Sequence, residues 1–277
     1  MFKKKSVKRS LRQIIAIVEK EVFLALRVKA TFFFRFLNPM IQLILFIFIF
    51  GIIFNIKSGY SIGYWNGSNF VLFLLLAYIV QFSKAINVKY RNSFVNEKYW
   101  KTLSAIMVAP VNRFTLLIGI LVSQLILISV PLIFLFILAL ILYPISILFI
   151  LLVFLIFISI FLTFAGIGLI IGVFGISYEE LEPYANLILR FLFLFSCANY
   201  PKELFPPIIQ SFIVINPFYY MFDLLRLTWY MGINYEEAIS HITVIHIVMV
   251  LLLTILIPII ALVLFERIYK KYGITGY

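Results

Sequence analysis

The chain alternates between long apolar runs and short polar breaks. Six runs come close to or exceed the length that crosses a bilayer, at about 34–55, 69–88, 114–142, 147–174, 185–200 and 242–265. A helix of about 20 apolar residues crosses a hydrocarbon core of about 30 Å with its own backbone hydrogen bonds satisfied, whereas β-barrel strands alternate in polarity. The pattern therefore predicts six transmembrane helices.

The third and fourth runs are separated only by the segment Tyr143-Pro144-Ile145-Ser146. Pro144 has no backbone N–H and disfavours helical geometry at the residue before it. We therefore expect a tight hairpin between two spans rather than one very long helix.

Residues 1–33 form an amphipathic segment before the first span. Basic residues lie opposite apolar ones that recur at helical spacing: Leu11, Ile14, Ile15, Val18, Val22 and Leu26. This pattern predicts a helix lying in the cytoplasmic interface, with a solvated basic arm as the alternative. The first apolar run starts late and no small-residue cleavage site follows a short apolar core, so we expect this segment to be retained.

Composition supports an all-α integral membrane protein. Hydrophobic residues make up 64% and charged residues 12% of the chain, and the mean hydropathy is +1.13. Soluble proteins average about 45–50% and about 25%. The chain is therefore one transmembrane domain over residues 1–277.

The basic residues indicate the orientation, because cytoplasmic flanks retain Lys and Arg. Of the 23 lysines and arginines, three fall on one side: Lys57, Lys202 and Arg226. The others place both termini and the polar segment 84–113 in the cytoplasm of a multi-pass cell-membrane protein. The net charge of +12 therefore indicates topology and contact with anionic membrane lipids, not nucleic-acid binding.

Motifs for catalysis or metal binding are missing from the sequence. The lone Cys197 cannot form an intrachain disulfide. His241 and His246 are five residues apart, whereas helical zinc pairs prefer four, so they are expected to be ordinary interfacial histidines and no metal site is predicted. Neither a G-x-x-x-x-G-K-[ST] phosphate loop nor a D-D-x-x-D cluster occurs, so the chain is not expected to be an enzyme.

Several polar side chains lie at or near membrane depth, where unpaired burial is costly. They are candidates for a translocation path, with interhelical hydrogen bonding, or snorkelling for the arginine, as the alternative: Gln42, Gln81, Ser83, Asn186, Arg190 and Asn199. The fourth run also carries a G-x-x-x-G motif at Gly168 and Gly172. This motif is typical of close helix packing and of dimer faces.

The cytoplasmic loop 89–113 contains a short amphipathic pattern that Pro110 would end. Its apolar residues recur at spacings of three and four: Trp100, Leu103, Ile106 and Met107. Such a helix can insert an apolar ridge into a groove on a soluble partner, with Glu97 and Lys101 at the rim, or it can lie on the lipid surface.

The outer segment 201–230 is divided by prolines into apolar pieces that are too short to cross, 208–215 and 218–227. We expect shallow re-entrant or interfacial helices that close the outer mouth before the last span. Asn216 before Pro217 is typical of a helix start with Asn as N-cap. Asp223 and Arg226 are three residues apart and are placed to pair on one helix face.

Two segments carry a family resemblance that covers nearly the whole chain. The loop resembles the E-R-E-x-G-T-L and S/A-P-V-x-R patterns of type-2 ABC transporter permeases, with Lys101 in place of a small residue; the matching residues are Glu97, Thr102, Leu103, Ala109, Pro110, Val111 and Arg113. The outer segment is similar to the family's P-x-x-x-x-P, N-P-x-x-Y and acid-x-x-Arg patterns, through Pro201, Pro206, Asn216, Pro217, Tyr220, Asp223 and Arg226.

The resemblance implies a permease of an ATP-driven exporter, paired with a second copy or a sister permease and with separate ATP-binding subunits that hold ATP and magnesium. It implies partner coupling through Glu97, Trp100, Lys101, Thr102, Leu103, Met107, Pro110 and Arg113, and an outer gate in segment 201–230. The second and fifth spans would line the path of a drug, lipid or lipid-linked glycan. An ATP-independent channel or secondary carrier is the alternative, although the spans hold no central acid for ion coupling.

Overall fold

The computed structural model describes residues 2–27, 29–56, 61–99, 113–177 and 181–272. Within these ranges the chain is almost entirely helical, which confirms the all-α membrane fold. The helices before the tight hairpin are α1 (Phe2–Arg27), α2 (Lys29–Ile56), α3 (Phe70–Ser83), α4 (Ala85–Tyr99) and α6 (Arg113–Leu142). After it come α7 (Ile147–Ser177), α8 (Leu181–Leu194), the 3-10 turn η1 (Lys202–Leu204), α9 (Pro207–Ile215), α10 (Pro217–Met231), α11 (Tyr235–His241) and α12 (Val244–Tyr272).

Four helical segments of the described chain are long and apolar enough to cross a membrane: Phe70–Ser93, Phe114–Leu142, Ile147–Gly175 and Val244–Ile268. The pair α9 and α10, bent by 91° at its break, would make a fifth if it counts as one span. The apolar stretches of α2 and α8 are shorter, Leu37–Ile52 and Pro183–Leu194. Six crossings therefore stay a prediction.

The polar segment 84–113 begins as helix rather than as a loop. Helix α4 follows α3 after a single turn residue, Lys84, so the rod runs on to Tyr99 and takes in residues 89–99 of the expected coupling loop. At about 1.5 Å per residue the pair is about 45 Å long.

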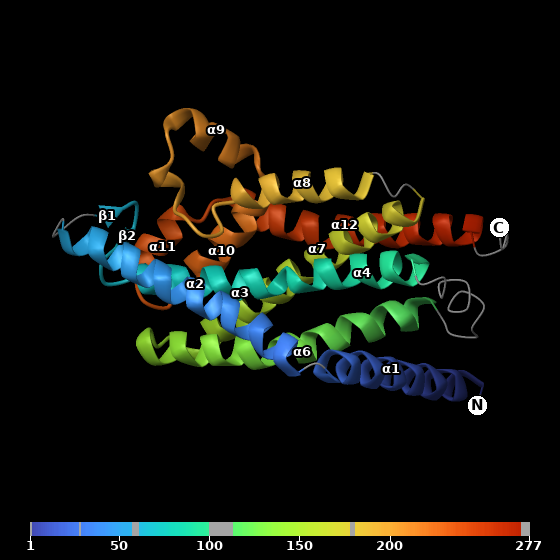
Figure 1. The fold of residues 1–277 in the computed structure, drawn as a ribbon. Coiled ribbons are helices and arrows are strands. Elements are labelled where there is room, and N and C mark those ends of the chain that lie inside the picture. Colours follow the sequence, from blue (N-terminus) through green and yellow to red (C-terminus); the bar gives the residue numbers. More distant parts are fainter. Residues whose placement is uncertain (1, 28, 57–60, 100–112, 178–180, 273–277) are drawn as a thin grey trace.

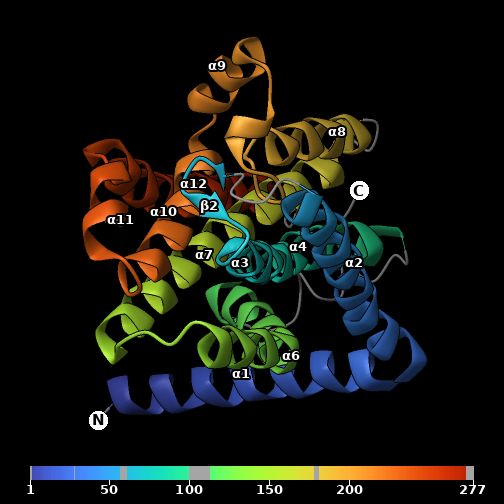
Figure 2. The same ribbon diagram turned by 90° about the vertical axis from the view of Figure 1, so that its left-hand side faces the viewer.

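Helix α3 lies at the centre of the bundle, as Figure 2 shows, with α2, α6, α7 and α10 packed around it. Its residues from Leu72 to Val80 are all buried. A helix that is apolar on every side is expected in such a position. In contrast, α7 and α12 leave large apolar side chains exposed, such as Ile147 and Val244, as expected for helices that face lipid.

The predicted hairpin is confirmed between α6 and α7. Helix α6 ends at Leu142 and α7 begins at Ile147. The Tyr143 hydroxyl donates to the Ser68 carbonyl at 2.7 Å, and the Trp229 indole donates to the Tyr143 carbonyl at 3.2 Å. These bonds fasten the hairpin to the start of α3 and to α10.

The glycine edge of α7 packs inside the chain. A Cβ on Gly168 would lie 2.5 Å from the Asn87 carbonyl oxygen, and one on Gly172 would lie 3.1 Å from the Arg91 Cα. Only glycine lets the α4 backbone come this close. The close-packing prediction is therefore correct, and the partner of this edge is α4 of the same chain rather than a second copy.

The amphipathic helix α1 packs against α6 and runs across the lower edge of the bundle in Figure 2. A Cβ on Gly119 of α6 would lie 2.7 Å from the Ile17 side chain. Glu21, only 8% exposed, forms an ion pair with Lys89 of α4. The N-terminal helix is thus joined to the rod formed by α3 and α4.

Figure 1 shows the start of α1 and the end of α12 at one end of the bundle. The small hairpin of β1 (Ser61–Ile62) and β2 (Trp65–Asn66) lies at the opposite end, with α9 and α11. We call these the terminal end and the outer end.

Candidate functional site

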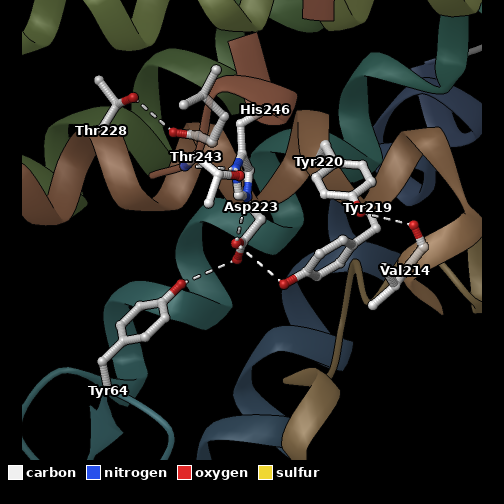
Figure 3. A network of polar contacts seen from close by, with 9 residues as sticks. Tyr64, Val214, Tyr219, Tyr220, Asp223, Thr228, Thr243 and His246 are labelled. Atoms are coloured by element: carbon white, nitrogen blue, oxygen red, sulfur yellow. Dashed lines mark hydrogen bonds and ion pairs between the residues drawn. The ribbon is translucent and has the colours of Figure 1, made fainter. Parts of the chain in front are cut away.

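A network of polar contacts surrounds Asp223 of α10 at the outer end (Figure 3). Tyr64, in the turn between β1 and β2, donates its hydroxyl to Asp223 Oδ1 at 3.1 Å. Tyr219, one helical turn before Asp223, donates to Oδ2 at 3.3 Å. His246 Nε2 lies 3.3 Å from the same oxygen. Asp223 thus joins the hairpin, α10 and α12, although it is only 9% exposed.

The contacts of His246 determine where its proton lies. The backbone N–H of Thr243 donates to His246 Nδ1 at 3.2 Å, and the Thr243 hydroxyl is 2.8 Å from the same nitrogen. A nitrogen that accepts a backbone N–H carries no proton, so the proton of the neutral ring is on Nε2 and faces Asp223. His246 is 4% exposed. His246 is thus a buried partner of Asp223, a role that the sequence did not predict.

A glycine turn and a helix N-cap position the hairpin and α10, which carry members of this network. Gly63 has a φ of +62°, a conformation that glycine adopts easily, and this turn places Tyr64 over α10. As predicted, Asn216 is the N-cap of α10: its side chain accepts from the Phe218 N–H at 3.1 Å. The Asn216 amide also donates to the Leu192 carbonyl, so it ties α10 to the end of α8.

Burial keeps Tyr64 a hydrogen-bond donor. Tyr64 lies outside the long helices, and its burial, followed by the negative charge of Asp223, raises the pKa of its hydroxyl well above the ordinary value. The hydroxyl therefore stays protonated and continues to donate to Asp223.

Arg226 lies beside the network without pairing with Asp223 as the spacing suggested. It is 2% exposed, donates to the Ala198 carbonyl and lies 4.0 Å from the centre of the Phe73 ring. Its Nε atom has no hydrogen-bond partner in the part of the chain that the structure describes. Arg226 thus connects α10 with the central helix α3 and with the turn after α8.

A cavity of about 240 Å³ lies against these side chains. Asp223, Arg226 and His246 line it together with Lys202 and Glu203 of η1. Among the other outer-gate residues, Pro201 lines the same cavity, and the Tyr220 hydroxyl donates to the Val214 carbonyl at 2.8 Å. Pro206 is exposed at the start of α9. Four of the predicted gate residues, Pro201, Tyr220, Asp223 and Arg226, thus line one polar cavity at the outer end.

The residues predicted for a translocation path lie in separate places. Gln81 donates to Asn199 at 2.9 Å and joins α3 to the turn after α8. Ser83 donates to the Val80 carbonyl of its own helix, and Gln42 is exposed on α2. The remaining two, Asn186 and Arg190, line a second cavity with residues of α4.

Most of the predicted coupling residues lie outside the described residues: Trp100, Lys101, Thr102, Leu103, Met107 and Pro110. Glu97 lies in the last turns of α4, and Arg113 begins α6. The structure therefore places the two ends of the coupling loop on two neighbouring helices.

Comparison with protein families decides the class of this chain. The family model of the ABC-2 type transporter matches residues 12–230, which include the coupling loop, the whole of α3 and the Asp223 segment of α10. The chain belongs to the ABC-2 type transporter family. Among curated proteins, none matches it.

Membership of this family makes the chain a multi-pass membrane permease component of an ABC transporter. The membrane domain of the family has no ATPase activity of its own, and it generally pairs with an ABC ATP-binding subunit. For this ABC-2 type permease, sequence patterns pointed to Asp223 but missed its partners Tyr64, Tyr219 and His246. Tyr64 and His246 are 159 and 23 residues away along the chain. A buried carboxylate needs donors, but the sequence does not say which ones reach it.

Proposed function

We propose that this chain is the membrane-spanning subunit of an ATP-driven exporter that moves an amphiphilic or hydrophobic substrate out of the cytoplasm. Two such permeases, identical or sister chains, would work with separate ATP-binding subunits that hold ATP and magnesium. Both termini would lie in the cytoplasm of a cell-membrane protein, with the Asp223 network on the far side.

The observation that carries this proposal is the extent of the family match. It covers residues 12–230, which include both the coupling loop and the Asp223 segment of α10. The arrangement of the chain supports the orientation, because the start of α1 and the end of α12 lie together, opposite the β-hairpin (Figure 1). The excess of basic residues belongs to the terminal end.

The rod of α3 and α4 supports a direct mechanical route from the loop to the outer gate. Its terminal end leads into the coupling loop, and glycine contacts hold α4 against α7. Toward the outer end, Phe73 of α3 lies under the guanidinium of Arg226. A displacement of α4 by an ATP-binding subunit would therefore reach α10 at Arg226, because closely packed helices transmit strain to one another.

The test is co-expression with candidate ATP-binding subunits. The chain should co-purify with one of them, and amphiphiles in liposomes should stimulate ATP hydrolysis by the complex. Glu97→Arg should reduce stimulated hydrolysis and transport at least tenfold while membrane insertion is unchanged. Glu19→Arg, an exposed acid on α1, is the matched control and should leave both activities in place.

Two results would contradict the proposal. If replacement of residues 96–107 by a Gly/Ser linker leaves binding of the ATP-binding subunit intact, the coupling assignment is wrong. If the chain alone transports substrate in liposomes without ATP, it is a channel or a secondary carrier.

A further inference from the structure

A second cavity, of about 220 Å³, lies between α4, α7 and α8 around the junction of α3 and α4. Three cationic side chains line it, namely Lys84, Arg91 and Arg190, and the described lining contains no Asp or Glu. Two asparagines, Asn87 and Asn186, complete the polar wall.

Two of these cations, Lys84 and Arg91, lie inside the candidate span Phe70–Ser93, and Lys84 is farther from its end at Ser93. The Lys84 Nζ atom is 3.2 Å from the centre of the Phe193 ring of α8, and no described carboxylate lies within ion-pair distance. An ionisable side chain within a span is costly and marks a functional site by default. The cation–π contact offsets part of that cost and turns the ammonium toward α8.

Asn87 provides an independent observation at this cavity. It is 3% exposed, and its Nδ2 atom has no hydrogen-bond partner in the described chain. The backbone of Gly168 holds it in place from the other side. An unpaired buried donor costs free energy, so native proteins normally give such a group an acceptor.

The cavity therefore presents donors to whatever enters it. Arg91 already donates to Asn186 and Asn92, so the donors considered for a ligand are Lys84, Asn87 and Arg190. Arg190 is exposed on α8, which leaves the cavity open at that helix. A ligand that satisfies two cations and an amide donor at once needs several acceptor oxygens and negative charge, and a phosphate group has both.

The remaining walls indicate what the phosphate is attached to. They are apolar and aromatic, formed by Val88, Phe164, Leu189 and Phe193. We propose that this cavity binds the phosphate headgroup of an amphiphile, with Lys84, Arg190 and the Asn87 amide as its donors. The inference rests on the proposed function in one respect only, that the bound amphiphile is the exported substrate.

The test is calorimetric titration of the full-length chain in neutral detergent. Dihexanoyl phosphatidic acid is the probe, and dihexanoylglycerol, which lacks the phosphate, is the matched ligand. The phosphatidic acid should bind and the diacylglycerol should bind at least tenfold more weakly. Lys84→Met and Arg190→Met should each weaken phosphatidic acid binding about tenfold, as expected for loss of one charge-assisted hydrogen bond.

Arg267→Met is the control, because Arg267 is exposed on α12 and lines neither cavity described above. It should bind phosphatidic acid with unchanged affinity. If Lys84→Met does not fold, Arg190→Met still decides, since its side chain is exposed. Equal affinity for the diacylglycerol, or unchanged binding in Arg190→Met, would overturn the proposal.

Two further arms identify the source of the phosphate. If inorganic phosphate binds as tightly as phosphatidic acid, the proposal that the ligand is an amphiphile is wrong. Phosphatidylglycerol in nanodiscs that displaces the probe completely would support the headgroup site but assign it to a resident membrane lipid instead of a substrate. These titrations need no ATP-binding subunit, so their failure and a failure of the proposed transport function are distinguishable.

Discussion

The contact of α7 with α4 at Gly168 leads to the sharpest prediction. In Gly168→Ala, the new Cβ would lie 2.5 Å from the Asn87 carbonyl oxygen and 2.6 Å from the Asn87 Cα. Both neighbours are backbone atoms, so no side-chain rotation relieves the clash. Helix α4 must move away from α7, or the variant must lose stability.

The expected magnitude follows from two opposing effects. Alanine is favoured over glycine in a helix interior by about 1 kcal/mol. Overpacking costs about 1–3 kcal/mol, and here it also weakens the neighbouring approach of Gly172 to Arg91. Because both clashing neighbours are backbone atoms, the cost lies in the upper part of that range, about 2–3 kcal/mol. We therefore expect a net loss of about 1–2 kcal/mol, which corresponds to a fall of about 2–8 °C in apparent unfolding temperature for a chain of this size.

Gly51→Ala is the matched control for this measurement. Gly51 also lies within a helix, α2, but a Cβ there meets no atom within 4 Å. Thermal unfolding of both variants in detergent, followed by size-exclusion chromatography, should show Gly168→Ala below the parent protein and Gly51→Ala at or above it. If the two variants behave alike, α4 and α7 do not approach as closely as described.

Two other contacts carry predictions. Asp223→Asn leaves one side-chain acceptor oxygen for the three donors around Asp223, so it should lower the free energy of unfolding by about 1–3 kcal/mol. Tyr64→Phe removes one of those donors and should cost about 1 kcal/mol. Thermal unfolding compares the two variants, and an equal loss would argue against a carboxylate shared by three donors. Lys89→Met leaves the buried Glu21 without its closest cation and should expose α1 to limited proteolysis, while the double variant with Glu21→Gln should recover protection. Unchanged digestion in Lys89→Met would show that the ion pair does not anchor α1.

Local signals in the sequence predicted several elements correctly. Pro144 identified the hairpin between two long spans, and Asn216 with Pro217 identified the start of α10, because both effects depend on the geometry of adjacent residues. The glycines at 168 and 172 were identified as a packing edge from spacing alone. Their partner was not, since a G-x-x-x-G motif carries no information about which helix it meets.

Local sequence patterns did not predict the partners of the buried polar side chains. Sequence spacing suggested that Asp223 pairs with Arg226 on the same helix, but Arg226 bonds to the turn after α8, and only one of the three partners of Asp223, Tyr219, lies on α10. In a buried setting, an acceptor is satisfied by whichever donors the fold brings near, and Tyr64 and His246 arrive from distant parts of the chain. Lys84 lies where the predicted second span, 69–88, overlaps the polar segment 84–113, and only the arrangement of α4, α7 and α8 makes it part of the wall of a cavity.

The sequence by itself determined the membrane class, the helical fold and the family, because hydropathy, helix length and short motifs depend on residues close together in the chain. Only the tertiary structure decided the partners of Asp223, the packing of α7 against α4 and the cationic cavity beside α8. Each of these depends on groups from distant parts of the chain that come within about 3–4 Å of one another, and the order of residues along the chain does not specify such contacts.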